Sequence, residues 1–121
     1  MLLQPEFIRT DKRGRLIQLT SGLWEQINIL EIKKGKSMGG HYHKETHEFF
    51  YVISGHVNVF IYRKGDKDNR EFEAKAGECF TIGVDEYHYI EGLKASKLVV
   101  ILSKKYNAQN PDIHTGGLDA M

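Results

Sequence analysis

Histidine has the most informative distribution of any residue in this chain. Six histidines occur among 121 residues, and three of them lie within the seven residues from His41 to His47. His41 and His43 are separated by one residue, so on an extended strand both imidazoles point to the same side. Glu48 follows five residues after His43 at the head of an apolar run, and His88 comes shortly after a second apolar run much later in the chain.

Imidazole and carboxylate groups are the side chains that proteins use for borderline transition metals. Three neutral imidazoles and one carboxylate can make a compact shell of nitrogen and oxygen ligands, suited to Zn, Mn, Fe, Ni or Co. The remaining coordination positions would be open to water or substrate. The donor set does not select the metal, because relative affinities follow the same order at most such sites.

The elements that must position these side chains are predicted to be short strands. Glycines recur between apolar runs, a spacing typical of strands joined by turns, and helix signals are weak. The candidate strands span 16–19, 24–32, 48–54, 56–62, 71–74, 78–82, 87–90 and 97–102.

Alternation is clearest in the strand at 56–62. Val57, Val59 and Ile61 occupy one face, and polar and aromatic side chains occupy the other. The charged segment 63–70 that follows is predicted to be an exposed hairpin tip. Eight short antiparallel strands must cover their apolar faces, so the pattern predicts an all-β sandwich or barrel.

The composition excludes several classes of protein. Seventeen Lys and Arg against sixteen Asp and Glu leave a net charge of +1, which offers no field for binding a phosphate backbone. The longest apolar stretches have five residues, far fewer than the roughly 20 that cross a bilayer. The first residues do not have the pattern of a secretory signal. We therefore expect one domain over 1–121 in the cytoplasm, with neither nucleic acid nor membrane as a partner.

The spacing of glycines and candidate ligands resembles the first motif of the cupin superfamily. That motif reads Gly, five residues, His-x-His, three or four residues, Glu, six residues, Gly. Gly35, His41, His43, Glu48 and Gly55 match every fixed position. The resemblance implies a single-domain, cupin-type antiparallel β-barrel, also described as a double-stranded β-helix or jelly roll.

The second cupin motif is matched in part. It reads Gly, five residues, Pro-x-Gly, two residues, His, three residues, Asn, and here Gly77 and His88 are in place. Gly83, Asp85 and Gly92 replace the usual Pro, Gly and Asn. The resemblance covers a core of about residues 15–103 and implies that the metal ligands are His41, His43, Glu48 and His88.

Other segments resemble small cupins that act on nucleotide sugars. These include keto-sugar isomerases and epimerases of deoxysugar pathways and the C-terminal cupin of capsular-polysaccharide reductases. The segments are 11–16, 39–44, Tyr106 and 110–112. The related metal-independent 3,4-ketoisomerases tend to carry Arg at the position of Met38 and a non-acidic residue at that of Glu48. The difference favours a metal site in this chain.

The function that this resemblance implies is a metal-dependent isomerase or epimerase of a small keto-sugar, either free or nucleotide-linked. The metal would polarise the carbonyl and stabilise an enediolate while a nearby base moves the proton. The candidate catalytic bases are His47, Tyr42, Tyr51 and Tyr62. A tyrosine, with an ordinary pKa of about 10, would need activation by the cation or by burial. His47 is also an alternative ligand.

Two other functions use the same residues. An iron, nickel or copper dioxygenase would place substrate and dioxygen at the open metal positions. A non-catalytic module would capture a sugar or another small ligand without turnover. It would be recognised by a metal-filled barrel with no titratable group, beyond the ligands, near the open position.

The two ends of the chain have separate expected roles. Small cupins usually pair through sheet edges or exchanged N-terminal strands, which covers an exposed edge. We therefore expect a homodimer in which residues 7–19 supply the pairing strand. Residues 104–121 are expected to form an extended C-terminal tail, frayed at its end.

Overall fold

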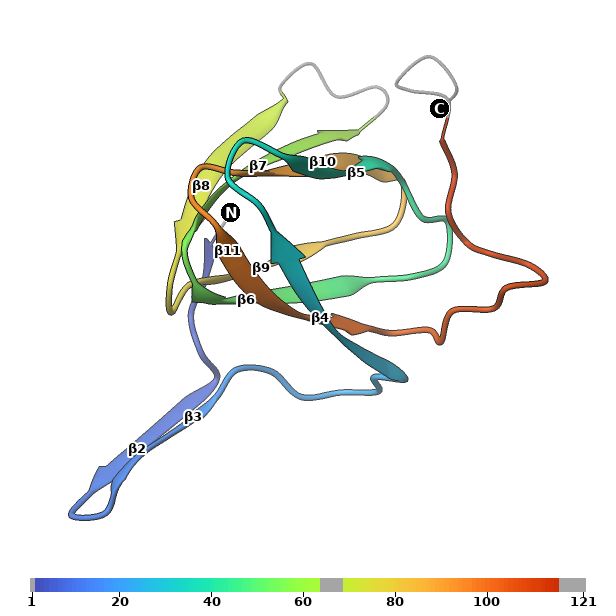
Figure 1. The fold of residues 1–121 in the computed structure, drawn as a ribbon. Coiled ribbons are helices and arrows are strands. Elements are labelled where there is room, and N and C mark those ends of the chain that lie inside the picture. Colours follow the sequence, from blue (N-terminus) through green and yellow to red (C-terminus); the bar gives the residue numbers. More distant parts are fainter. Residues whose placement is uncertain (1, 64–68, 116–121) are drawn as a thin grey trace.

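The computed structural model describes residues 2–63 and 69–115, and every regular element in them is a β-strand (Figure 1). The strands are β1 (Leu2–Leu3), β2 (Phe7–Asp11), β3 (Gly14–Gln18), β4 (Gln26–Ile32), β5 (Ser37–His41), β6 (Glu48–Ser54), β7 (His56–Arg63), β8 (Arg70–Lys75), β9 (Cys79–Ile82), β10 (Glu86–Gly92) and β11 (Ser96–Leu102). The predicted all-β class is confirmed.

Two antiparallel sheets enclose the core. One has the strand order β1-β9-β6-β11-β4, and the other has the order β5-β10-β7-β8. The expected alternation in β7 is confirmed, because Val57, Val59 and Ile61 are at most 2% exposed and face the interior. Phe80 is fully buried, with its ring stacked on that of Phe50 at a centroid distance of 4.8 Å. The core therefore fills the space between the sheets.

β5 is a strand that the sequence prediction missed, because two of its five residues are glycines. Gly39 and Gly40 have φ values of +105° and +75°, which glycine adopts without steric cost. A Cβ at Gly39 would lie 2.7 Å from the carbonyl oxygen of His88. The glycine thus allows β5 to approach β10 closely, and the resulting register sets His41 opposite His88.

The N-terminal segment differs from the single pairing strand expected over 7–19. β2 and β3 form a two-stranded antiparallel hairpin that projects from the barrel (Figure 1). Phe7, Ile8 and Leu16 are each about half exposed on it. A lone two-stranded hairpin is only marginally stable in water, so this arm would gain from a partner surface. Pairing of two chains through it stays a prediction.

The C-terminal segment after β11 runs back to the barrel (Figure 1). Tyr42 and His114 form an isolated antiparallel bridge in which each backbone N–H donates to the other's carbonyl oxygen at 3.0 Å. The expected fraying over 116–121 lies outside the described residues, as does the hairpin tip at 64–68. No helix in the described part of the chain could span a membrane.

Candidate metal centre

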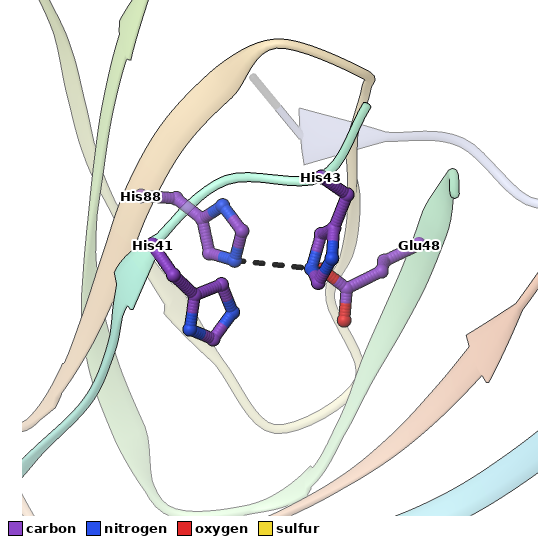
Figure 2. A group of neighbouring side chains, drawn as sticks. All are labelled: His41, His43, Glu48 and His88. Atoms are coloured by element: carbon purple, nitrogen blue, oxygen red, sulfur yellow. Dashed lines mark ion pairs between the residues drawn. The ribbon is translucent and has the colours of Figure 1, made fainter. Parts of the chain in front are cut away.

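Four side chains from β5, β6, β10 and the loop after β5 converge inside the barrel (Figure 2). His41, His43, Glu48 and His88 each offer one ligand atom, and these atoms all lie within 4.8 Å of one another. The structure thus brings together the four residues predicted to be ligands. Their binding of a metal stays a prediction.

Backbone carbonyls assign the tautomers of two of these histidines. Nδ1 of His43 lies 2.6 Å from the carbonyl oxygen of Asp112, and Nδ1 of His88 lies 2.9 Å from that of Glu86. A carbonyl only accepts, so each Nδ1 carries the hydrogen and donates it. The Nε2 lone pairs of both rings are then directed toward Glu48.

The buried polar atoms at the centre fit a cation. Nε2 of His43 lies 2.8 Å from Oε1 of Glu48, yet both atoms are buried without a hydrogen-bond partner among the described residues. Nε2 of His88 lies 3.4 Å from the same oxygen. Acceptors that face one another at such distances require a proton or a metal ion between them. This donor set, with Nδ1 of His43 and of His88 bonded to backbone carbonyls, is one that divalent transition metals prefer.

The charges within the cluster shift its titration. Burial lowers the pKa of His41 to about 4, with the charges of His88 and His43 adding to the effect. Burial also lowers the pKa of His88. At Glu48, burial opposes ionisation, but the close contact with His43 and the charges of the three histidines outweigh it and lower the pKa. Burial would lower the pKa of His43 as well, but Glu48 more than compensates and raises it above 6.5.

These shifts predict how metal affinity depends on pH. Because the pKa of His43 is raised, its ring holds a proton over a wider pH range than a free imidazole does. Below that pKa, metal binding must displace this proton. Below the pKa of His43 the apparent affinity is expected to rise by about tenfold per pH unit, and above that pKa it should level off. Titration with Zn²⁺ against a competing chelator at several pH values measures this slope. His56→Ala, outside the cluster, should keep the same profile, and a flat profile would contradict the assignment.

A cavity of about 610 Å³ opens beside the cluster. His41, Glu48 and His88 reach its wall, and Asn28 on β4 supplies a further polar side chain. The other lining residues are apolar or glycine: Ile27, Ile29, Leu30, Met38, Gly39, Phe50, Ile90 and Val100. The cavity can therefore hold a small molecule against the exposed side of the cluster.

The structure does not bring the tyrosine candidates for the base to this cavity. Tyr51 and Tyr62 occupy positions of β6 and β7 that alternate with core residues, so both face outward. Tyr42 alternates with His41 and His43, and its ring packs against that of His114 with a centroid distance of 5.3 Å. These placements follow from the two-residue period of a strand.

His47 is also absent from the lining of the cavity. It is exposed, and its backbone N–H donates to the hydroxyl of Ser103 at 2.8 Å. Its neighbour Glu48 is the residue that points inward. Of the residues that the structure describes, no titratable side chain other than His41, Glu48 and His88 lines the cavity.

The departures from the second cupin motif leave His88 in place. Asp85 has a φ of +59°, a left-handed conformation that glycine favours and aspartate tolerates. Its N–H donates to the carbonyl oxygen of His43 at 2.7 Å. The turn before β10 is thereby tied to the loop that carries one of the candidate ligands.

Asp112 is the residue at this site whose role the sequence reasoning missed. The resemblance included 110–112, but no local pattern connects Asp112 with His43, which lies 69 residues away. Burial opposes ionisation of Asp112, but hydrogen bonds from Lys44, Glu45, Thr46 and His114 outweigh it and lower its pKa to about 2. The residue is thus a carboxylate that accepts several hydrogen bonds.

Comparison with known proteins identifies the fold. The sequence model of the family described as "Polysaccharide biosynthesis C-terminal domain" matches residues 9–114. No curated protein sequence matches the chain. The capsular polysaccharide assembling protein CapF from Staphylococcus aureus is similar in structure, with a TM-score of 0.72 and 22% identity. The match covers 98% of this chain and 35% of CapF, so the chain spans about a third of that protein's length.

Two further solved structures share the fold over most of the chain. QdtA, a sugar 3,4-ketoisomerase from Thermoanaerobacterium thermosaccharolyticum solved with TDP, has a TM-score of 0.78 and 17% identity. That match covers 99% of this chain and 89% of QdtA. The rmlC epimerase of Mycobacterium tuberculosis has a TM-score of 0.72 and 19% identity, covering 94% of this chain and 66% of the epimerase. The predicted cupin-type jelly roll is confirmed.

Proposed function

Because the chain belongs to the family of polysaccharide biosynthesis C-terminal domains, we propose that it is a metal-dependent isomerase or epimerase of a small keto-sugar. The observation that carries this proposal is the convergence of His41, His43, Glu48 and His88, all of which except His43 line a cavity. The structural likeness to a sugar ketoisomerase and a sugar epimerase supports the choice of reaction class.

Different residues have different roles in the proposed site. A divalent cation bound by the four ligands would act as a Lewis acid that polarises a substrate carbonyl and acidifies the neighbouring C–H bond. Glu48 supplies the negative charge that holds the cation. The backbone carbonyls of Asp112 and Glu86 accept from Nδ1 of His43 and His88, respectively. This leaves the Nε2 lone pair of each ring available to bind a metal. The apolar walls would exclude water around the sugar ring.

The cavity also limits which part of a substrate it can hold. Among the described residues that line it, none is a lysine or an arginine. The diphosphate of a nucleotide-linked sugar would find no counter-ion inside. In this proposal the keto-sugar ring enters the cavity, and any nucleotide portion remains outside it.

A second candidate function is favoured by the same lining. Proton transfer between carbons needs a base within hydrogen-bond reach of the substrate. In the described part of the cavity, the titratable side chains are the candidate ligands themselves. A module that binds a small ligand without turnover needs no such base, so ligand capture is the alternative to the isomerase.

Deuterium exchange distinguishes the two candidates. We expect protein loaded with Zn²⁺ or Mn²⁺ to incorporate solvent deuterium next to the carbonyl of a nucleotide-linked 4-keto-sugar, as measured by mass spectrometry. His88→Ala should abolish the incorporation. Glu73→Gln, which alters a carboxylate on β8 outside the cluster, should retain it.

The other outcomes are equally specific. Saturable binding of the keto-sugar with neither exchange nor a new product would overturn the isomerase and support ligand capture. Consumption of dioxygen with a small organic substrate would instead favour the dioxygenase chemistry that the same ligands can support.

A further inference from the structure

Asp112 contacts every residue from His43 to Thr46, the first part of the loop that joins two of the candidate ligands. Its carbonyl oxygen accepts from Nδ1 of His43 at 2.6 Å. Its carboxylate accepts from the backbone N–H groups of Lys44 and Glu45 at 2.8 Å each. The hydroxyl of Thr46 donates to the same carboxylate at 2.9 Å.

Neighbours in the C-terminal segment hold Asp112 in this position. Nε2 of His114 lies 3.1 Å from Oδ1 of Asp112. His114 also pairs with Tyr42 through two backbone hydrogen bonds and packs its ring against the Tyr42 ring. The segment is therefore attached at neighbouring points, at Tyr42 and along the loop that begins with His43.

The position of this loop affects both of the candidate ligands that it joins, because the loop is short. Four residues, 44–47, separate His43 from Glu48, so a shift of the loop moves both side chains. Thr46 is only 4% exposed. Without the carboxylate its hydroxyl would lose a partner in a place that water reaches poorly, at a cost in stability.

From these contacts we infer that Asp112 is a positioning residue for the proposed metal centre. Its carboxylate fixes the loop between His43 and Glu48, and its backbone carbonyl holds the His43 ring in the tautomer that leaves Nε2 free to bind a metal. This inference rests on the proposed metal binding, but its effect on the tautomer of His43 exists in the metal-free protein as well.

Asp112→Asn tests the inference with the smallest change in shape. The amide keeps one oxygen that can accept hydrogen bonds, but its NH₂ group would face N–H and O–H donors of the loop. The loop would therefore lose part of its attachment to residue 112. We expect the Kd for Zn²⁺, measured against a competing chelator, to rise about 10- to 100-fold, as for other residues that orient metal ligands. Glu73→Gln is the matched control, since Glu73 is also a carboxylate beside a histidine, at 3.1 Å from Nε2 of His56. It should leave the Kd unchanged.

The tautomer of His43 gives a readout that separates this inference from the proposed function. In the metal-free wild type above the pKa of His43, ¹⁵N NMR of the ring should show hydrogen on Nδ1 alone. In Asp112→Asn it should show a mixture of the two tautomers. If the wild type bound no Zn²⁺, the metal proposal would fail while the NMR comparison still tested Asp112.

A milder variant covers the case in which Asp112→Asn does not fold. Thr46→Val removes one donor to the carboxylate and is expected to weaken Zn²⁺ binding several-fold. Wild-type Zn²⁺ affinity and a single His43 tautomer, in Asp112→Asn or in Thr46→Val if the former is unfolded, would overturn the inference.

Discussion

Glu48→Gln is expected to weaken binding of divalent transition metals by about 100-fold or more, while the protein stays folded. The substitution removes the one negative charge of the proposed ligand set and keeps the shape of the side chain. Its effect should exceed the 10- to 100-fold loss typical of residues that only orient ligands. Metal content of the purified protein and competition with a chelator measure the change.

Thermal unfolding provides a second measurement of the same variant. A metal at 100 times its Kd stabilises the wild type by about 2.7 kcal/mol. For a chain of this size that corresponds to a rise in Tm of roughly 10 °C. Glu48→Gln should lose this rise.

The metal-free form of the variant should be less stable than the metal-free wild type. Glu48 is a buried carboxylate, 8% exposed, whose Oε1 faces Nε2 of His43 at 2.8 Å. The lowered pKa of Glu48 means that the folded state favours its carboxylate. An uncharged glutamine loses this contribution, so the Tm without metal should fall at neutral pH, and the metal-dependent rise in Tm is compared within each protein. Glu73→Gln again serves as the control. Equal metal occupancy in Glu48→Gln and the wild type would contradict the proposed ligand set.

Three of the four residues of the candidate centre have local spacing, whereas His88, 40 residues after Glu48, is assigned through the resemblance to the second cupin motif. His41 and His43 share a face by the period of an extended chain, and Glu48 begins a strand whose apolar run is evident from the sequence. The faces of β7 could be assigned for the same reason. In each case, the signal lies within a few residues of the feature that it predicts.

The rest depends on contacts between distant segments. β5 could not be recognised from side-chain alternation, because Gly39 and Gly40 have no side chains to alternate. Its strand character comes from its register with β10. The hydrogen bond between Asp112 and His43 joins residues that are 69 positions apart, and no local sequence pattern predicts it. The tyrosine candidates were selected by residue type, whereas the alternation of side chains along the chain turns all three away from the cavity.

Gly55→Ala is the second substitution with a large expected effect, and it acts on the fold. Gly55 joins β6 to β7 with a φ of +95°. A Cβ there would lie 2.3 Å from Oγ of Ser96 and 2.6 Å from the carbonyl oxygen of Ala95. The left-handed conformation costs an alanine about 1–2 kcal/mol, and forcing atoms into a packed site costs about 1–3 kcal/mol more. We expect the free energy of unfolding to fall by about 2–5 kcal/mol in total.

The loss should be large because Ser96 cannot move freely. Its hydroxyl accepts from the N–H of His56 at 3.0 Å and lies 2.8 Å from the carbonyl oxygen of Lys94, to which it donates. It thereby ties the turn between β6 and β7 to the turn between β10 and β11. A methyl group at Gly55 must displace this hydroxyl and break both hydrogen bonds.

Gly77→Ala is the matched control for this argument. Gly77 has a φ of +89°, but a Cβ there meets no heavy atom within 4 Å. It should therefore lose only the conformational part, about 1–2 kcal/mol. Urea denaturation of both variants measures the difference, which isolates the close approach of the two turns. Equal losses in the two variants would show that the backbone conformation at Gly55, and not its contact with Ser96, requires the glycine.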